Sequence, residues 1–201
     1  LGVPVVYASS AAVYGENTAL PLKETAVTHP LSPYGLDKLA CEWQAEMGAR
    51  IKGLKSAGLR FFNVYGPRQD PRSPYSGVIS IFSDRLKQGQ ALGVFGDGEQ
   101  TRDFIFVSDI VAALAASMQK LHQGAFARLV SNVCRGESVS VNTLAQVLSQ
   151  VAGVSARIDY KPPREGDIVH SRGDATLMNE KLGVLAQTDL RHGLEALWRS
   201  L

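Results

Sequence analysis

Apolar and polar positions alternate along the chain in blocks that predict strands and helices in turn. The continuous apolar run 3–8 is typical of a buried strand in a parallel sheet that is covered on both faces. After a long polar loop, Ser32 and Pro33 match an N-cap followed by proline at the first helical position. We therefore expect a helix over 33–52, and a second strand at the next apolar run, 59–64.

The rest of the chain continues this alternation. Apolar residues at helical spacing over 78–86 and 144–151 predict two helices, and Ser140 is placed to cap the second. Asp109 is placed to cap a further helix over 110–121. The remaining expected elements are a short strand and turn over 89–98, strands over 104–107, 129–133 and 158–160, and a last helix from Thr188 or Asp189. Strands that alternate with helices indicate the α/β class.

The composition argues against several classes of protein. Of the 201 residues, 45% are hydrophobic and 20% are charged, which suits a globular chain with a buried core. A formal net charge of +2 gives no support to nucleic-acid binding or to a membrane surface. No apolar run approaches the about 20 residues of a membrane span. The two cysteines, Cys41 and Cys134, form no CxxC pair, so we expect a reducing, cytoplasmic setting.

Tyr34 and Lys38 lie four residues apart at the start of the expected helix, so both project from one face. An ammonium beside a tyrosine favours the phenolate, which makes the phenol a usable proton acceptor. The pattern is short and common, and by itself it favours a solvated pair. Ser9 and Ser10 favour the functional interpretation, because they follow a buried strand at the point where parallel sheets form a ligand crevice.

Other single residues leave their role open. Asn63 ends the second strand, where its side chain can contact a ligand or bond the backbone of the turn. Arg102 and Arg164 suit diphosphate oxygens, although most single arginines are solvated or paired structurally. The four histidines show no metal-ligand spacing, so we expect no metal. Three side chains on apolar helix faces are assigned to the packed core: Trp43, Trp198 and Cys41.

Five segments follow one another along nearly the whole chain. They are YASSAAVYG (7–15), SPYGLDK (32–38), LRFFNVYGPRQDP (59–71), GDGEQTRDFIFVSDI (96–110) and REGDIVHS (164–171). Together they resemble the NAD-dependent epimerase/dehydratase family of extended short-chain dehydrogenases/reductases, and most of all its UDP-hexose 4-epimerases. The resemblance implies the C-terminal part of a Rossmann-like doubly wound parallel sheet, a smaller α/β substrate-binding domain, and NAD as cofactor.

The resemblance also implies a role for Ser10, Tyr34 and Lys38 at the reacting carbon. Ser10 would hydrogen-bond the C4 hydroxyl of the sugar, and Tyr34 would take its proton while hydride leaves C4 for NAD. Lys38 would lower the pKa of Tyr34 and bind the nicotinamide ribose, so Ser9, Tyr34 and Lys38 are the implied cofactor contacts. Hydride would then return to the other face of the 4-keto sugar, without net redox.

A set of substrate contacts is implied in the same way. The implied substrate-binding residues are Asn63, Tyr75, Val78, Phe95, Arg102, Arg164, Asp167 and Ser171. The small Ser171 would leave room for a 2-acetamido group, so UDP-N-acetylhexosamines would be accepted. Similar dehydratases carry an acidic residue soon after the catalytic hydroxyl, whereas Ala11 and Ala12 stand here, which favours epimerisation.

The chain departs from the family at its start. It lacks the GxxGxxG loop that binds the NAD pyrophosphate, and it opens without Met directly before a strand, so we expect upstream sequence to be missing. Residues 1–66 would then be the remnant of the NAD domain and 67–201 mainly the substrate domain, with helix 110–121 returning to the former. The Tyr34 helix is implied to form a homodimer. The open alternatives are a non-catalytic sugar-nucleotide-binding remnant, a heptose 6-epimerase and a UDP-glucuronate decarboxylase.

Overall fold

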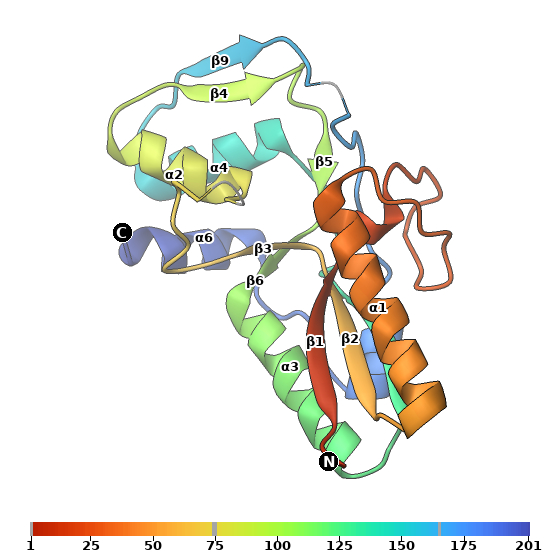
Figure 1. Cartoon of the computed structure of the whole chain (residues 1–201). Helices are drawn as coiled ribbons and strands as arrows, with labels where there is room; N and C mark the ends of the chain where they lie inside the picture. Colours follow the sequence, from red (N-terminus) through yellow and green to blue (C-terminus); the bar gives the residue numbers. More distant parts are fainter. Residues whose placement is uncertain (1, 74–75, 165) are drawn as a thin grey trace.

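A parallel sheet forms one half of the computed structural model, which describes residues 2–73, 76–164 and 166–201 (Figure 1). The sheet has three strands in the order β1-β2-β7, namely β1 (Val5–Ser10), β2 (Ser56–Phe61) and β7 (Arg128–Val133). The last residues of the strands, Ser10, Phe61 and Val133, stand in register at one edge. This edge is where an α/β sheet presents its ligand crevice.

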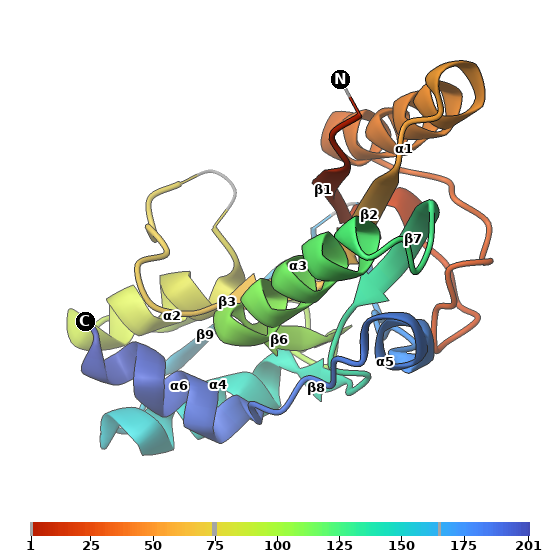
Figure 2. The ribbon, with the colours of Figure 1, turned by 90° about the horizontal axis from the view of Figure 1, so that it is seen from below.

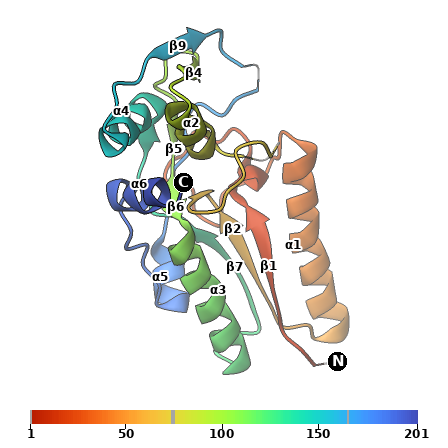
Figure 3. The same ribbon diagram turned by 90° about the vertical axis from the view of Figure 1, so that its left-hand side faces the viewer.

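Helices cover both faces of the sheet (Figure 3). The helix α1 (Pro33–Lys52) packs on one face, and α3 (Val107–His122) packs on the other, with α5 (Thr176–Leu182) beside α3 and β7. A short 3-10 helix, Ala11–Tyr14, leads out of β1. We call β1, β2, β7, α1, α3 and α5 the sheet body. The expected helix over 110–121 therefore contacts β1 and β2, although the division of the chain into domains stays a prediction.

The second half, which we call the small lobe, is built from three helices and a two-stranded sheet. Its helices are α2 (Val78–Lys87), α4 (Val141–Ala152) and α6 (Leu190–Arg199), and its parallel strands are β4 (Leu92–Phe95) and β9 (Ile158–Lys161). Figure 2 shows α4 and α6 side by side, apart from α3 and α5. Fully buried Leu144, Leu148 and Leu194 join their apolar faces into one core.

Two short strand pairs connect the halves. The strand β3 (Asn63–Tyr65) pairs in parallel with β6 (Phe104–Phe106), and β5 (Thr101–Arg102) pairs antiparallel with β8 (Val139–Ser140).

The prediction of one strand over 59–64 was wrong, because the chain changes partner at Phe62. The Phe62 N–H donates to Val133 O at 3.1 Å, whereas the next N–H, of Asn63, donates to Asp103 O at 2.9 Å. The strand β2 also starts earlier than expected, at Ser56. Its Ser-Ala-Gly start carries no strand-forming pattern, but Gly58 leaves room for the ring of Tyr7, whose hydroxyl oxygen would lie 2.4 Å from an added Cβ.

Three further expectations need correction. Asp109 does not cap α3, since the N-cap is Phe106 and Asp109 lies in the first turn. The sequence analysis missed α5, whose seven residues are too short to show helical periodicity. Trp43 and Cys41 are exposed rather than core residues, because only one side of α1 packs on the sheet. Trp198 does pack against the core of the small lobe.

Candidate functional site

The first turns of α1 carry the tyrosine and lysine that the sequence singled out. Ser32 caps the helix, its Oγ accepting the Gly35 N–H at 3.1 Å, and Pro33 occupies the first helical position. Lys38 Nζ donates to Ala8 O at 3.1 Å and lies 5.7 Å from the centre of the Tyr34 ring. The Lys38 ammonium is therefore held between β1 and the ring of Tyr34.

Ser10 is positioned by the end of β1 and the turn that follows. Its backbone is still extended, and its Oγ accepts the Ala12 N–H at 3.1 Å as the cap of the 3-10 helix. Ser10 and Tyr34 line one cavity of about 330 Å³, together with Asn63 and Val78. The cavity thus brings together side chains from β1, α1, β3 and the start of α2.

Ser9 points to the opposite face of β1 from Ser10, as alternation along a strand requires. It is buried, and its Oγ donates to Glu42 Oε1 at 2.5 Å. Arg60 of β2 meets the same carboxylate with Nε at 2.9 Å and Nη2 at 2.7 Å, and its Nη1 donates to Tyr14 OH at 2.9 Å. The Ser9 side chain is therefore held inside this buried cluster, and its implied contact with the cofactor stays a prediction.

A smaller cavity of about 180 Å³ continues from the first. It shares Ser10 and Asn63 with the first cavity and adds Arg102 and Ser171. The Ser171 N–H donates to Thr101 O at 3.2 Å, which ties the loop before α5 to β5. The side chain of Ser171 is thereby brought to the same crevice as Ser10.

The largest cavity, about 870 Å³, lies beside β4 and β9 and is lined by Phe95, Arg164 and Asp167. The guanidinium carbon of Arg164 lies 3.7 Å from the centre of the Phe95 ring, a cation–π contact. Arg102 Nη2 pairs with Asp167 Oδ1 at 2.6 Å, while burial lowers the pKa of Arg102. His170 lines both this cavity and the 180 Å³ one, so the three cavities follow one another from Tyr34 to Phe95.

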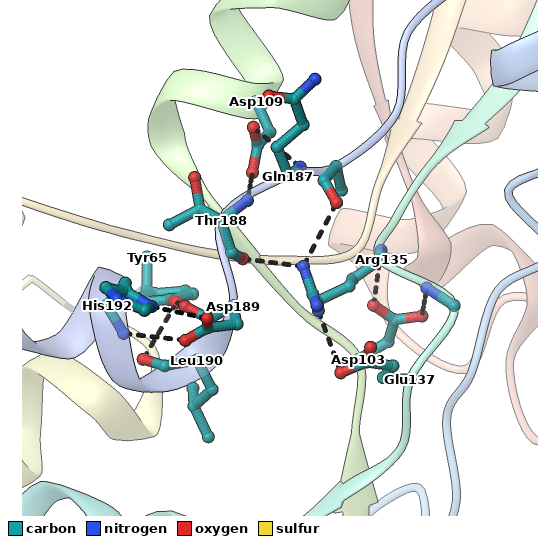
Figure 4. Close-up of polar contacts among 12 residues, drawn as sticks. Tyr65, Asp103, Asp109, Arg135, Glu137, Gln187, Thr188, Asp189, Leu190 and His192 are labelled. Atoms are coloured by element: carbon teal, nitrogen blue, oxygen red, sulfur yellow. Dashed lines mark hydrogen bonds and ion pairs between the residues drawn. The ribbon is translucent and has the colours of Figure 1, made fainter.

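Buried carboxylates hold the loops around these cavities (Figure 4). Asp103 accepts the backbone N–H groups of Arg135 and Gly136, each at 2.9 Å. The guanidinium of Arg135 turns the other way and donates to Ala186 O at 3.2 Å and Thr188 O at 3.0 Å. The segment between α5 and α6 is thus fixed to the end of β7.

The comparisons with known proteins agree with this arrangement. The sequence model described as "NAD dependent epimerase/dehydratase family" matches residues 1–133. The chain belongs to the NAD-dependent epimerase/dehydratase family. The predicted resemblance and the Rossmann-like α/β fold class are thereby confirmed.

One curated relative and two solved structures illustrate the family match. UDP-glucose 4-epimerase of Mycolicibacterium smegmatis is 37% identical over 191 residues, which cover 94% of this chain and 59% of the relative. UDP-glucose 4-epimerase of Thermotoga maritima, with UDP-glucose, has a TM-score of 0.91 at 39% identity, covering 97% of this chain and 62% of that one. UDP-N-acetylglucosamine 4-epimerase of Methanobrevibacter ruminantium has a TM-score of 0.90 at 36% identity, covering 98% and 62%.

This family member spans about 60% of the length of its relatives. Two of the residues implied to contact NAD are accessible to a ligand, because Tyr34 opens to the first cavity with 44% of its surface exposed and Lys38 lies beside it. No glycine-rich loop between a strand and a helix N-terminus occurs in the described residues to take the pyrophosphate. Tyr75 lies outside the described residues.

The sequence analysis missed the buried cluster around Glu42 and Arg60. A signal was present, because an arginine inside the apolar run LRFF and a glutamate one turn after Lys38 both require partners when buried. Burial also raises the pKa of Tyr14 to about 12, so its hydroxyl stays protonated and donates to Asn132 Oδ1 at 2.6 Å. Among the described residues, no cluster of potential metal ligands occurs, and no helix is both long and apolar enough to cross a membrane.

Proposed function

We propose that this family member carries the catalytic and substrate-binding part of an NAD-dependent UDP-hexose 4-epimerase. The observation that carries the proposal is the cavity shared by Ser10, Tyr34 and Asn63, which continues past Arg102 and Ser171 to Phe95 and Arg164. Tyr34, the proposed proton acceptor, lies at one end of this series of cavities, and Arg164 lies at the other. A UDP-sugar needs both, a proton acceptor for its sugar hydroxyl and cations for its diphosphate. The similarity to two 4-epimerases with UDP-sugars in their structures supports the same substrate class.

In this proposal Tyr34 takes the proton of the sugar C4 hydroxyl, helped by the ammonium of Lys38. Ser10 Oγ accepts the Ala12 N–H and keeps its own hydrogen, which it donates to the C4 oxygen. NAD, when bound, accepts a hydride from C4 and returns it. The hydroxyl of Tyr34 then gives the proton back to the C4 oxygen of the inverted sugar, so the tyrosine ends each turnover as it began.

We propose that the diphosphate of the UDP-sugar lies in the cavities lined by Arg102 and Arg164. Arg102 and Arg164 supply planar guanidinium groups that match diphosphate oxygens. Phe95, which Arg164 covers on one face, is proposed to lie close to the base. Asp167 already neutralises Arg102, so binding of the diphosphate replaces or shares that ion pair. Asn63 and Val78 complete the contacts, from the first residue of β3 and the first residue of α2.

The identity of the sugar is proposed from residues close to Ser10. Ala11 and Ala12 hold no group that transfers a proton, which favours epimerisation over elimination of water. The small Ser171 at the 180 Å³ cavity leaves space for a 2-acetamido group. We therefore expect turnover of both UDP-glucose and UDP-N-acetylglucosamine, and product analysis that found only the first would contradict this role of Ser171.

We also infer a homodimer through α1. Four large apolar side chains on its outer face are exposed, namely Leu36, Trp43, Met47 and Ile51. They recur at intervals of seven and four residues, so they form one stripe that a second copy can cover. Light scattering should give twice the chain mass, and Trp43→Glu should return it to the monomer. The two free cysteines fit a reducing, cytoplasmic location.

The direct test uses the chain as it exists, with added NAD. We expect UDP-glucose to bind in calorimetry, and any interconversion of UDP-glucose and UDP-galactose to fall by at least about 10²-fold in Tyr34→Phe, the usual contribution of a general base. Tyr34→Phe should leave UDP-glucose affinity nearly unchanged. Binding without turnover in the unmodified chain would favour the non-catalytic alternative, and absence of binding would overturn the proposal.

A further inference from the structure

Asp103 is a fully buried carboxylate that lies between β5 and β6, directly after Arg102. Its Oδ1 accepts the N–H of Arg135 at 2.9 Å, and its Oδ2 accepts the N–H groups of Gly136 at 2.9 Å and Gly173 at 3.1 Å. One side chain thus joins three segments that are far apart in the sequence. They are the link from β5 to β6, the turn after β7 and the loop before α5.

The loop before α5 contains residues that line the candidate site. The loop that ends at Gly173 contains Ser171 and follows Arg164 and Asp167. None of the described residues 162–164 and 166–169 lies in a helix or strand. Three backbone contacts hold its outer side. Val169 O accepts the Thr101 N–H at 2.9 Å, and the Ser171 N–H donates to Thr101 O at 3.2 Å. Arg172 O accepts the Leu22 N–H at 2.8 Å. Asp103 is the side chain that holds the loop from the interior.

The loop has little freedom to shift at that point. A Cβ on Gly173 would lie 2.5 Å from Cys134 Sγ and 2.7 Å from Phe62 Cζ, so the backbone itself packs against the core. The position of Gly173 is therefore set by the shape of the core and by its hydrogen bond to Asp103. Ser171 is two residues away, on the wall that faces Ser10.

No side-chain cation neutralises Asp103 among the described residues. The guanidinium of Arg135 points to Ala186, Thr188 and Glu137, and that of Arg102 pairs with Asp167. Burial raises the pKa of Asp103 to about 6, so at pH 7.5 the group is mainly ionised. Three backbone N–H dipoles directed at one carboxylate hold that charge, as in a backbone anion site.

We propose that Asp103 is a positioning residue for the sugar-nucleotide site, which fixes the loop with Ser171 and its own neighbour Arg102 relative to Ser10. This inference rests on the proposed function. It predicts that Asp103→Asn, which keeps the shape but turns an amide N–H toward backbone N–H groups, lets the loop move. The effect should fall on ligand affinity and not only on stability.

The chain contains a matched control in Asp109. It is also largely buried, and its carboxylate also accepts backbone N–H groups, from Gln187 at 3.4 Å and Thr188 at 3.2 Å (Figure 4). Its loop joins α5 to α6, and Asp109 lines none of the three cavities of the site. Asp109→Asn therefore removes the same kind of contact without reaching Ser171.

The experiment compares UDP-glucose binding by calorimetry at pH 7.5 in the unmodified chain, Asp103→Asn and Asp109→Asn, with thermal unfolding measured for each. We expect Asp103→Asn to weaken binding about tenfold or more, the scale of a lost hydrogen bond to a charged group. Asp109→Asn should bind as the unmodified chain does, although both variants unfold at lower temperature. Equal affinities in all three proteins, or equal losses in both variants, would overturn the inference while leaving the proposed function standing. If the unmodified chain does not bind UDP-glucose, the proposed function itself fails.

If Asp103→Asn does not fold, hydrogen exchange in the unmodified chain tests whether Asp103 holds the loop that contains Ser171. We expect the amides of Arg135, Gly136 and Gly173 to exchange at similar, slow rates, because they share one acceptor. UDP-glucose should slow the amides of Ser171 and Gly173 further. A fast-exchanging Gly173 beside protected Arg135 and Gly136 would contradict the role of Asp103.

Discussion

The sheet body and the small lobe contribute to the site in different ways. The sheet body presents Ser10, Tyr34 and Lys38 from the end of a strand and the first turns of a 20-residue helix. The small lobe and its connections present Phe95, from the end of β4, and Asp167, Ser171 and Arg164 from a loop. Proton transfer depends on fixed distances, which regular elements provide, whereas binding tolerates loops provided that their backbone is held.

The sheet body has an apolar core between the sheet and α3, but unlike the described part of the small lobe it also holds a buried ion pair. A bidentate Arg60–Glu42 ion pair, with both side chains about 7% exposed, lies between α1 and the sheet. The core of the small lobe is apolar, around Leu144, Leu148 and Phe82. A buried ion pair specifies which partners meet, while an apolar core contributes stability through packing. The comparison predicts different responses to mutation in the two halves.

The largest effect is expected in the sheet body. Arg60→Met leaves the Glu42 carboxylate buried without its cation, which should lower the free energy of unfolding by about 3–5 kcal/mol. The double variant Arg60→Met/Glu42→Leu should recover most of that loss, because it removes the unpaired charge. Urea unfolding gives the free energy of unfolding of both variants. A loss below about 1 kcal/mol in the single variant would mean that water or another group neutralises Glu42.

A smaller or equal effect is expected in the small lobe. Leu144 is fully buried in α4, so Leu144→Ala should lower the free energy of unfolding by about 2–5 kcal/mol through lost burial and the cavity left behind. Leu185→Ala is the control for the substitution itself, since Leu185 is 58% exposed in the segment between α5 and α6 and its replacement should change stability little. A similar decrease in the free energy of unfolding for both variants in the same urea titration would contradict this prediction.

Two helix caps allow a direct comparison of the halves. Ser32 caps α1 in the sheet body and Ser140 caps α4 in the small lobe, each accepting an N–H at 3.1 Å. Replacement of either serine by alanine should cost about 1 kcal/mol. If the halves unfold together, both variants shift one common thermal transition. Two separate transitions, each moved by one variant only, would show that the halves are independent folding units.

The smallest expected effect on stability is the pH-dependent contribution of one surface pair, Asp189 and His192. The Asp189 carboxylate accepts a hydrogen bond from His192 Nδ1 and raises the pKa of His192 above its ordinary 6.5. The pair therefore stabilises the fold at lower pH, and this contribution is lost as pH rises through the raised pKa. Asp189→Asn keeps a helix cap but removes the charge, and the pKa of His192 should fall back. A proton NMR titration of His192 measures the change, and an unchanged midpoint would refute the pairing.

The sequence determined the α/β class, most elements and the residues that line the crevice, because those properties depend on local pattern and on short motifs. Helix α1 begins at Pro33 as predicted, and Ser10, Tyr34 and Asn63, which the motifs predict as site residues, line one cavity. Their catalytic and binding roles stay predictions.

Only the tertiary structure decided how these pieces are held. The change of strand partner at Phe62, the burial of Ser9 against Glu42 and the exposure of Trp43 depend on which surfaces meet. The same is true of Asp103, whose three hydrogen-bond donors come from backbone groups that are 32, 33 and 70 residues away. Backbone N–H groups leave no trace in a side-chain pattern, so contacts of this kind become visible only once the chain has folded.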